Sequence, residues 1–289
     1  MNTMDSLKKI ILRKVNRLGQ KLPKRILRFV ADFPGVLRIL EMTSISDMQE
    51  ILTPEGYLLM INPLFHANLV HSGTLVNYEP VIRKSIVQFT RPGMTAYDIG
   101  ANVGVFTYLF ASRVTSQGIV YAFEPERINY TCLDKSIKIN DCKNIVLDKR
   151  AVGKSSGKEQ FDRRGGAFSG RLVGNNASYN KTDNIETVET VCLDYLIKEE
   201  GYRVPDIIKI DVEGNEGLVI EGMKYILDQY HPILICELHT HLGESGIKII
   251  ETLIAHGYSV TDAAHGSHIS KTDLQNTDLL NTHVIAVKK

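Results

Sequence analysis

A glycine-containing turn constrains this chain more than any other feature of its sequence. The segment Asp98-Ile99-Gly100-Ala101-Asn102-Val103-Gly104 begins within a short strand predicted at 95–99 and leads into a helix predicted at 104–114. Glycines in such a turn let the backbone approach a ligand that a Cβ atom would repel. The order of strand, glycine turn and helix predicts a ligand-binding crevice in an open α/β sheet.

A second buried strand is predicted at 119–124, because Ile119-Val120-Tyr121-Ala122-Phe123 is apolar and β-prone throughout. Glu124 lies at its carboxyl end, directly before Pro125. Ligands of open α/β sheets lie outside the carboxyl ends of the strands, so the glycine turn and Glu124 should face one crevice. A carboxylate there can accept hydrogen bonds from both hydroxyls of a ribose, which predicts a nucleoside-containing cofactor.

The residues of the turn favour S-adenosylmethionine over a dinucleotide. A dinucleotide fingerprint reads Gly-x-Gly-x-x-Gly, whereas Gly100 and Gly104 are separated by Ala-Asn-Val, without the middle glycine that admits a pyrophosphate. Asp98 would repel a pyrophosphate but suits a ligand that carries an ammonium group. S-adenosylmethionine has a ribose, an amino acid tail and a sulfonium but no phosphate, so we predict it as the cofactor.

Strands and helices alternate along much of the chain, which predicts a parallel sheet wrapped by helices. We expect 1–77 to form an N-terminal helical extension with a small lead-in layer, and 78–289 to form the catalytic domain. Residues 153–187 interrupt the alternation and are rich in Gly, Ser, Asn and Lys. We predict an inserted loop region there, which acts as a substrate lid or binding loop rather than as a linker.

Charge and hydropathy limit the partners of the chain. A formal net charge of +1 argues against a general polyanion binder. Basic residues concentrate in 8–28. This segment could make weak contact with an anionic membrane surface or an acidic partner, or it could be a solvated helical extension. We favour the solvated extension. No apolar run is long enough for a signal peptide or a membrane span, which predicts a cytoplasmic protein, peripheral to a membrane at most.

Three acids, Asp211, Glu213 and Glu216, follow the strand predicted at 207–211. Their position turns them toward the same crevice. A hydroxyl acceptor is a poor nucleophile until a base takes its proton, and Asp211 is our first candidate for that base or for the group that orients the hydroxyl, with Glu213 second. The alternative is that Glu213 and Glu216 cap the next helix, which we favour for Glu216.

Glu237, His239 and His241 alternate at the end of the strand predicted at 232–238, so they should share one face. His239 is a further candidate base, and we predict that Glu237, together with Ser169 in the insert, contacts the acceptor. Together with Asp211, the trio of Glu237, His239 and His241 could instead hold a divalent metal. Histidine is a poor ligand for magnesium, however, and we predict no metal site.

Taken together, these segments resemble the FkbM family of S-adenosylmethionine-dependent methyltransferases. The resemblance covers roughly residues 78–240, in order and at the expected spacing. It is carried by Asp98 to Gly104, Phe123-Glu124-Pro125, Asn140, Val191-Cys192-Leu193-Asp194, Lys209 to Glu216, Gly222, and Pro232 to Leu238. It implies a class I methyltransferase fold, with a mostly parallel seven-stranded sheet and helices on both faces. It also implies methyl transfer to oxygen, typically to a hydroxyl of a sugar or a secondary metabolite.

The resemblance also implies the residues that hold the cofactor. It assigns the methionine moiety to Asp98, Gly100, Asn102 and Gly104. Glu124, followed by Pro125, would hold the ribose, and Ala151 would border the adenine.

Several functions remain in competition at this point. The first is an O-methyltransferase for a hydroxyl of a sugar, a glycan or a glycosylated precursor. The second methylates a non-sugar metabolite, and the third is a non-catalytic module that kept the nucleoside pocket, which the acids at 211–216 oppose. A nucleic-acid methyltransferase is disfavoured, because no Asn/Asp-Pro-Pro-aromatic motif follows the strand at 207–211.

Overall fold

A computed structural model describes residues 48–63, 65, 66, 69, 75–163, 170–173, 185–239, 246–270 and 283–288. The basic segment 8–28, the predicted N-terminal helices, Ser169 and His241 lie outside the described residues. Among the helices that are described, none combines the length and the apolar character needed to cross a membrane.

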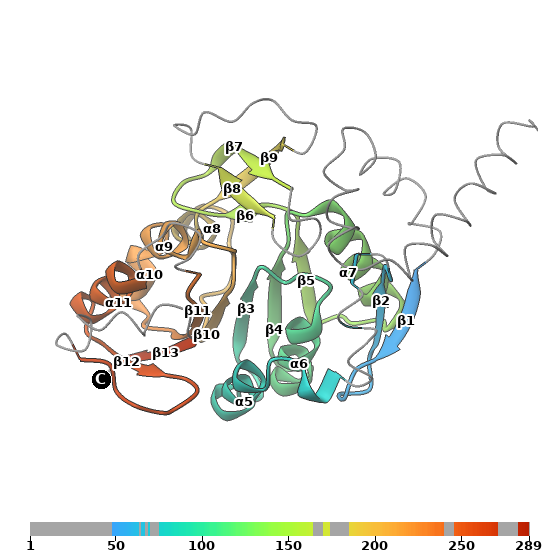
Figure 1. Ribbon diagram of the computed structural model, residues 1–289, viewed down its shortest axis with the longest axis horizontal. Coiled ribbons are helices and arrows are strands. Elements are labelled where there is room, and N and C mark those ends of the chain that lie inside the picture. Colours follow the sequence, from blue (N-terminus) through green and yellow to red (C-terminus); the bar gives the residue numbers. More distant parts are fainter. Residues whose placement is uncertain are drawn as a thin grey trace, which may run out of the picture.

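A seven-stranded sheet forms the centre of the molecule, with the strand order β12-β13-β11-β10-β3-β4-β5 (Figure 1). Neighbouring strands are parallel except at β13, which pairs antiparallel with both β11 and β12. The predicted mostly parallel seven-stranded sheet and the class I methyltransferase fold are thereby confirmed. The strands are β3 (Thr95–Ile99), β4 (Ile119–Phe123), β5 (Ile145–Asp148), β10 (Ile207–Ile210), β11 (Ile233–Glu237), β12 (Tyr258–Asp262) and β13 (His283–Lys288).

Helices cover both faces of this sheet, as predicted, because successive side chains of each buried strand point to opposite faces. Ala96 of β3 belongs to the core shared with α5, α6 and α7, whereas Tyr97 belongs to the core shared with α8, α9, α10 and α11. The first group is α5 (Pro80–Phe89), α6 (Val105–Val114) and α7 (Arg127–Ile139). The second is α8 (Leu193–Glu199), α9 (Glu216–Glu221), α10 (Lys224–Gln229) and α11 (Gly246–Ala255).

A small four-stranded sheet lies beyond the carboxyl ends of the central strands, at the top of the view in Figure 1. It consists of β6 (Ala151–Val152), β9 (Ile185–Val191), β7 (Gly157–Asp162) and β8 (Arg171–Val173), in that order. The prediction of a loop region at 153–187 is therefore wrong for the residues of β7 and β8 and for the first residues of β9. Phe161 and Leu172 pack with Ala151 and Val188 in a cluster of their own, which lets strands rich in polar residues form a sheet.

A hairpin of β1 (Gln49–Leu52) and β2 (Leu58–Ile61) packs along α7 (Figure 1). This hairpin lies within 1–77, where a small lead-in layer is predicted. The contact is polar as well as apolar, because Leu58 N donates to Asn140 Oδ1 at 2.9 Å and Met60 N donates to Ser136 Oγ at 2.7 Å. The hairpin thus binds to the same helix whose first turn begins beside Glu124.

Candidate active site

A cavity of about 300 Å³ opens at the carboxyl ends of β3, β4 and β10. The small sheet closes one side of it through Phe161 and Leu172. Most of the site residues predicted from the sequence lie in its wall, and Asp98 and Gly104 do not. The predicted residues in the wall are Gly100, Asn102, Glu124, Pro125, Ala151, Asp211, Glu213, Glu237 and His239.

The glycine turn is clamped between β4 and β10. Gly100 N and Ala101 N both donate to the carbonyl of Phe123, at 3.1 and 3.0 Å. Gly100 has φ +77°, and a Cβ atom at this position would lie 1.8 Å from the backbone oxygen of Asp211. Only glycine combines this left-handed conformation with so close an approach. The turn therefore sets the distance between the predicted cofactor-binding residues and Asp211.

Replacing Gly100 with alanine is expected to disrupt this turn, because the new Cβ atom would meet backbone rather than a flexible side chain. We expect the free energy of unfolding to fall by at least about 2 kcal/mol and S-adenosylmethionine binding to be lost. Gly201 is a matched control, since it has φ +72° and nothing within 4 Å of its Cβ position. Urea unfolding measures the stability of the two variants, and calorimetry measures their affinity for S-adenosylmethionine. Equal losses in both variants would contradict the role of the close contact between Gly100 and the backbone of Asp211.

Backbone amides of the glycine turn and of the segment before α7 hold Glu124 in place. Its carboxylate accepts from Asn102 N at 2.7 Å and from Glu126 N at 2.8 Å, and the residue is only 5% exposed. Burial raises the pKa of Glu124 to about 8, with a further contribution from the charge of Glu126, while the backbone hydrogen bonds oppose the rise. The side chain is therefore oriented before any ligand arrives.

The sequence analysis did not identify the residues that form a hydrogen-bonded chain with Glu124. A hydrogen bond from the side chain of Asn129 favours the ionised form of Glu124. Asn129 Oδ1 in turn lies 2.9 Å from His66 Nε2, which places a hydrogen on that nitrogen, and Asn62 N donates to His66 Nδ1 at 3.0 Å. Burial lowers the pKa of His66 to about 4, so its ring is neutral at physiological pH.

A buried ion pair connects the small sheet to the segment between Glu124 and α7. Glu126 accepts from Ile128 N at 2.6 Å and from Asn129 N at 2.9 Å, which caps α7. Its other oxygen pairs with the guanidinium of Arg163 at the end of β7, with Arg163 Nε at 3.1 Å. Neither Glu126 nor Arg163 was predicted as a site residue.

Lys209 connects two of the predicted acids beneath the turn. Its Nζ lies 3.3 Å from Asp98 Oδ1 and 3.3 Å from Asp211 Oδ2, and donates to Gly100 O at 3.2 Å. Burial alone would lower the pKa of Lys209, but the charges of Asp211 and Asp98 outweigh it and raise that pKa. Asp98 also accepts from Thr107 Oγ1 at 2.6 Å, so it is paired within the protein. The signal in the sequence is a lysine within the apolar strand Ile207-Ile208-Lys209-Ile210.

Asp211 faces the cavity from the end of β10. Burial raises the pKa of its carboxyl group, and the charge of Lys209 opposes the rise only in part. Glu213 lies two residues further on with φ +54°, and burial raises its pKa to about 7. Both candidate bases therefore hold a proton more readily than an exposed carboxylate does.

Glu216 does not cap α9 in the expected way. Its Oε1 accepts from Gly214 N at 3.1 Å and from Val212 N at 3.4 Å, and both donors lie before the helix. The same oxygen lies 2.8 Å from His239 Nδ1. Glu216 lies in the first turn of α9, where an acid favours the helix N-terminus, but its carboxylate accepts hydrogen bonds from the preceding loop and lies against His239 rather than binding the free amides of the helix.

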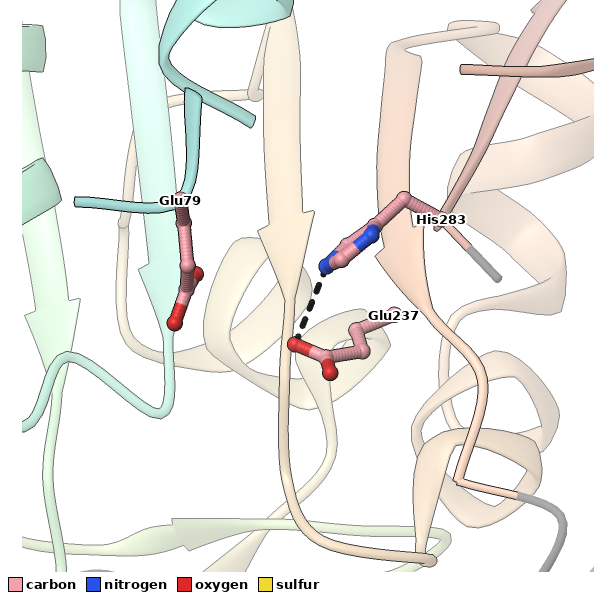
Figure 2. Close-up of side chains that lie close together, drawn as sticks. All are labelled: Glu79, Glu237 and His283. Atoms are coloured by element: carbon pink, nitrogen blue, oxygen red, sulfur yellow. Dashed lines mark ion pairs between the residues drawn. The ribbon is translucent and has the colours of Figure 1, made fainter. Parts of the chain in front are cut away.

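Two overlapping groups of carboxylates and imidazoles meet at Glu237. Figure 2 shows Glu79 from the segment before α5, Glu237 from the end of β11 and His283 from the start of β13, with Glu237 Oε2 3.2 Å from His283 Nε2. In this group, and in that of Asp211, Glu237 and His239, the possible ligand atoms lie within 4.8 Å of one another. His283 also forms an ion pair with Glu237, and His239 forms ion pairs with Glu237 and Asp211. That the site holds no metal stays a prediction.

Comparisons with known proteins agree on one family. Residues 98–260 match the family described as Methyltransferase FkbM domain. The chain is 29% identical over 202 residues to the 31-O-demethyl-FK506 methyltransferase FkbM of Streptomyces tacrolimicus. The aligned region covers 59% of this chain and 74% of that protein. It is 26% identical over 145 residues to the hexuronic acid methyltransferase AglP of Haloferax volcanii, which covers 50% of this chain and 55% of that protein.

Solved structures of similar proteins are more distant in sequence. The crystal structure of methyltransferase FkbM from Methylobacillus flagellatus KT is 15% identical and has a TM-score of 0.46. The similarity covers 71% of this chain and 50% of that chain.

Proposed function

The chain belongs to the FkbM methyltransferase family, and on this premise we propose that it methylates a hydroxyl oxygen of a sugar, a glycan or a glycosylated precursor. The methyl donor is S-adenosylmethionine. The observation that carries the proposal is the carboxylate of Asp211, which faces the cavity directly beside the glycine turn. The similarity to a hexuronic acid methyltransferase supports a sugar as the acceptor.

The wall of the cavity fits this cofactor. Gly100 lets the turn lie against the backbone of Asp211, and the oxygens of Glu124 would accept hydrogen bonds from the two ribose hydroxyls. Ala151 would border the adenine. Asp98 does not line the cavity and its charge is met by Lys209, so it would support the glycine turn rather than contact the ammonium group of the cofactor.

The protein's part in the reaction is to hold the acceptor and remove its proton. When bound, S-adenosylmethionine would supply an electrophilic methyl group, and the electron pair of its C–S bond would stay on the sulfur. The hydroxyl proton passes to a carboxylate oxygen of Asp211, which is a stronger base than an exposed aspartate because burial raises its pKa. Holding both reactants in line supplies much of the remaining acceleration.

A non-sugar hydroxyl is the second candidate acceptor. The observation in its favour is the 29% identity to an enzyme named for a demethylated FK506. Both candidates use the same base and the same cofactor site, so they differ only in the residues that contact the acceptor.

The test is a screen of acceptors with purified full-length protein and S-adenosylmethionine. We expect a mass gain of one methylene on a sugar or glycan, and no gain with the Asp211→Asn variant. A product formed only from non-sugar hydroxyl compounds would replace the first candidate with the second. Binding of the cofactor without turnover on any acceptor would leave a non-catalytic module and overturn both.

A further inference from the structure

The trio drawn in Figure 2 brings three possible metal ligands together from distant parts of the chain. Glu79 lies directly before α5, Glu237 ends β11 and His283 begins β13. One ligand atom from each lies within 4.8 Å of the others. Glu79 and Glu237 both line the cavity. Two carboxylates and an imidazole beside a cavity form a donor set that suits a divalent metal ion.

The separations within the trio fit ligands of one ion. Glu237 Oε2 and His283 Nε2 lie 3.2 Å apart. Metal–ligand bonds of about 2.0–2.2 Å place neighbouring ligands roughly 2.8–3.6 Å from each other and opposite ligands roughly 4.0–4.4 Å from each other. The widest separation in the trio is at most 4.8 Å, so the three atoms close onto an ion with a shift of about half an ångström. Rotation of one long carboxylate side chain supplies such a shift.

Glu79 offers a carboxylate oxygen that the protein leaves without a hydrogen bond. Its Oε2 is buried, and no hydrogen-bond partner for this atom lies in the part of the chain that the structure describes. A buried carboxylate oxygen without a partner is costly, and coordination to a cation removes that cost. Burial raises the pKa of Glu79, and the charge of Asp211 adds to the rise, although Lys209 opposes it. This carboxylate therefore lies among like charges that a cation would offset.

The neighbouring group of Asp211, Glu237 and His239 suits an ion less well. Lys209 Nζ lies 3.3 Å from Asp211 Oδ2, so a cation of the protein already meets this carboxylate. The ring of His239 is held through Nδ1, 2.8 Å from Glu216 Oε1. Asp211 is also our candidate base, and a carboxylate bound to a metal takes up a proton less readily. The trio with Glu79 is therefore the better candidate.

We propose that Glu79, Glu237 and His283 bind a divalent metal ion that accepts both oxygen and imidazole ligands, such as Mn²⁺ or Zn²⁺. Mg²⁺ is disfavoured because it prefers oxygen ligands. The ion replaces the ion pair between Glu237 and His283, since a histidine must be neutral to bind a metal. Three protein ligands leave further positions open to water or to oxygens of an acceptor in the cavity. The inference departs from the sequence-based prediction of no metal site, because no motif connects Glu79 and His283 to Glu237.

The experiment is calorimetry of Mn²⁺ and of Mg²⁺ on the full chain after treatment with a chelator. Mn²⁺ is the better probe, because Zn²⁺ also suits surface pairs such as His256 and Asp228. We expect one Mn²⁺ per chain, bound at least about tenfold more tightly than Mg²⁺. Glu79→Gln should weaken Mn²⁺ binding at least about tenfold, since even residues that only support a ligand contribute about 10- to 100-fold. Glu189→Gln, on the exposed part of β9 and outside the cavity wall, is the matched control and should not change the affinity.

His239→Gln separates the two groups of ligands. We expect this variant to keep its Mn²⁺ affinity within about threefold. Loss of binding in His239→Gln, with binding retained in Glu79→Gln, would overturn the inference. So would equal affinities of the unaltered protein for Mn²⁺ and Mg²⁺, or a Kd for Mn²⁺ above roughly 1 mM, and these measurements decide if Glu79→Gln does not fold. The titration requires neither cofactor nor acceptor, so its failure is distinct from failure of the proposed function, which is judged by turnover.

Discussion

Replacing Glu124 with alanine is expected to weaken S-adenosylmethionine binding by at least about 100-fold. The change removes a carboxyl group that can accept from two ribose hydroxyls, and hydrogen bonds between neutral groups contribute up to roughly 1.5 kcal/mol each. A loss of about 3 kcal/mol corresponds to about two orders of magnitude in Kd. The change also leaves Asn102 N and Glu126 N without their acceptor, so the turn loses its support at the same time.

Isothermal titration calorimetry on the purified protein measures this effect directly. Glu189→Ala is a suitable control, because Glu189 is exposed on β9 and does not line the cavity. Circular dichroism must show that Glu124→Ala is folded, and Glu124→Gln gives a second variant that retains one acceptor oxygen. If both Glu124 variants bind S-adenosylmethionine with a Kd within threefold of that of the unaltered protein, Glu124 does not hold the ribose.

Replacing Asp211 with asparagine is expected to lower kcat by about 10²- to 10⁴-fold, the usual contribution of a general base. The amide has nearly the same shape as the carboxylate but cannot take the hydroxyl proton. Affinity for S-adenosylmethionine should change less than about threefold, because Lys209 keeps its contact with Asp98 and the turn keeps its backbone hydrogen bonds.

Single-turnover kinetics with an identified acceptor separate this loss from a loss of binding. Glu213→Gln is the informative companion, since Glu213 is the second candidate base and its pKa is raised to about 7. A larger kcat effect at Glu213 than at Asp211 would exchange their roles. Full turnover in Asp211→Asn with normal cofactor affinity would show that the base lies elsewhere.

The parts of the site that the sequence predicted are those carried by local patterns. The glycine turn at 98–104 and the apolar strand before Glu124 are continuous segments, so periodicity and residue type identify them. The rule that ligands lie at the carboxyl ends of parallel strands then brought Glu124 and Asp211 to one crevice. Both line the cavity, which is why the S-adenosylmethionine prediction needed no tertiary contacts.

The polar contacts that orient these groups could not be predicted in this way. Lys209 meets Asp98 because β10 and β3 pair in a register that places the two residues side by side. The support of Glu124 by Asn129 and His66 joins α7 to the segment after β2, and local periodicity carries no information about such a pairing. The small sheet was missed for a related reason, since its polar strands are stabilised by a hydrophobic cluster that forms only on folding.

The sequence by itself therefore determined the fold class, the cofactor and the ends of the strands where chemistry occurs, because these depend on patterns within single elements. Tertiary structure alone decided that Glu216 contacts His239 and that Lys209 lies between two aspartates. Those contacts depend on strand register and on the packing of distant segments, and they set the charge of each group through burial and the distance to its partner.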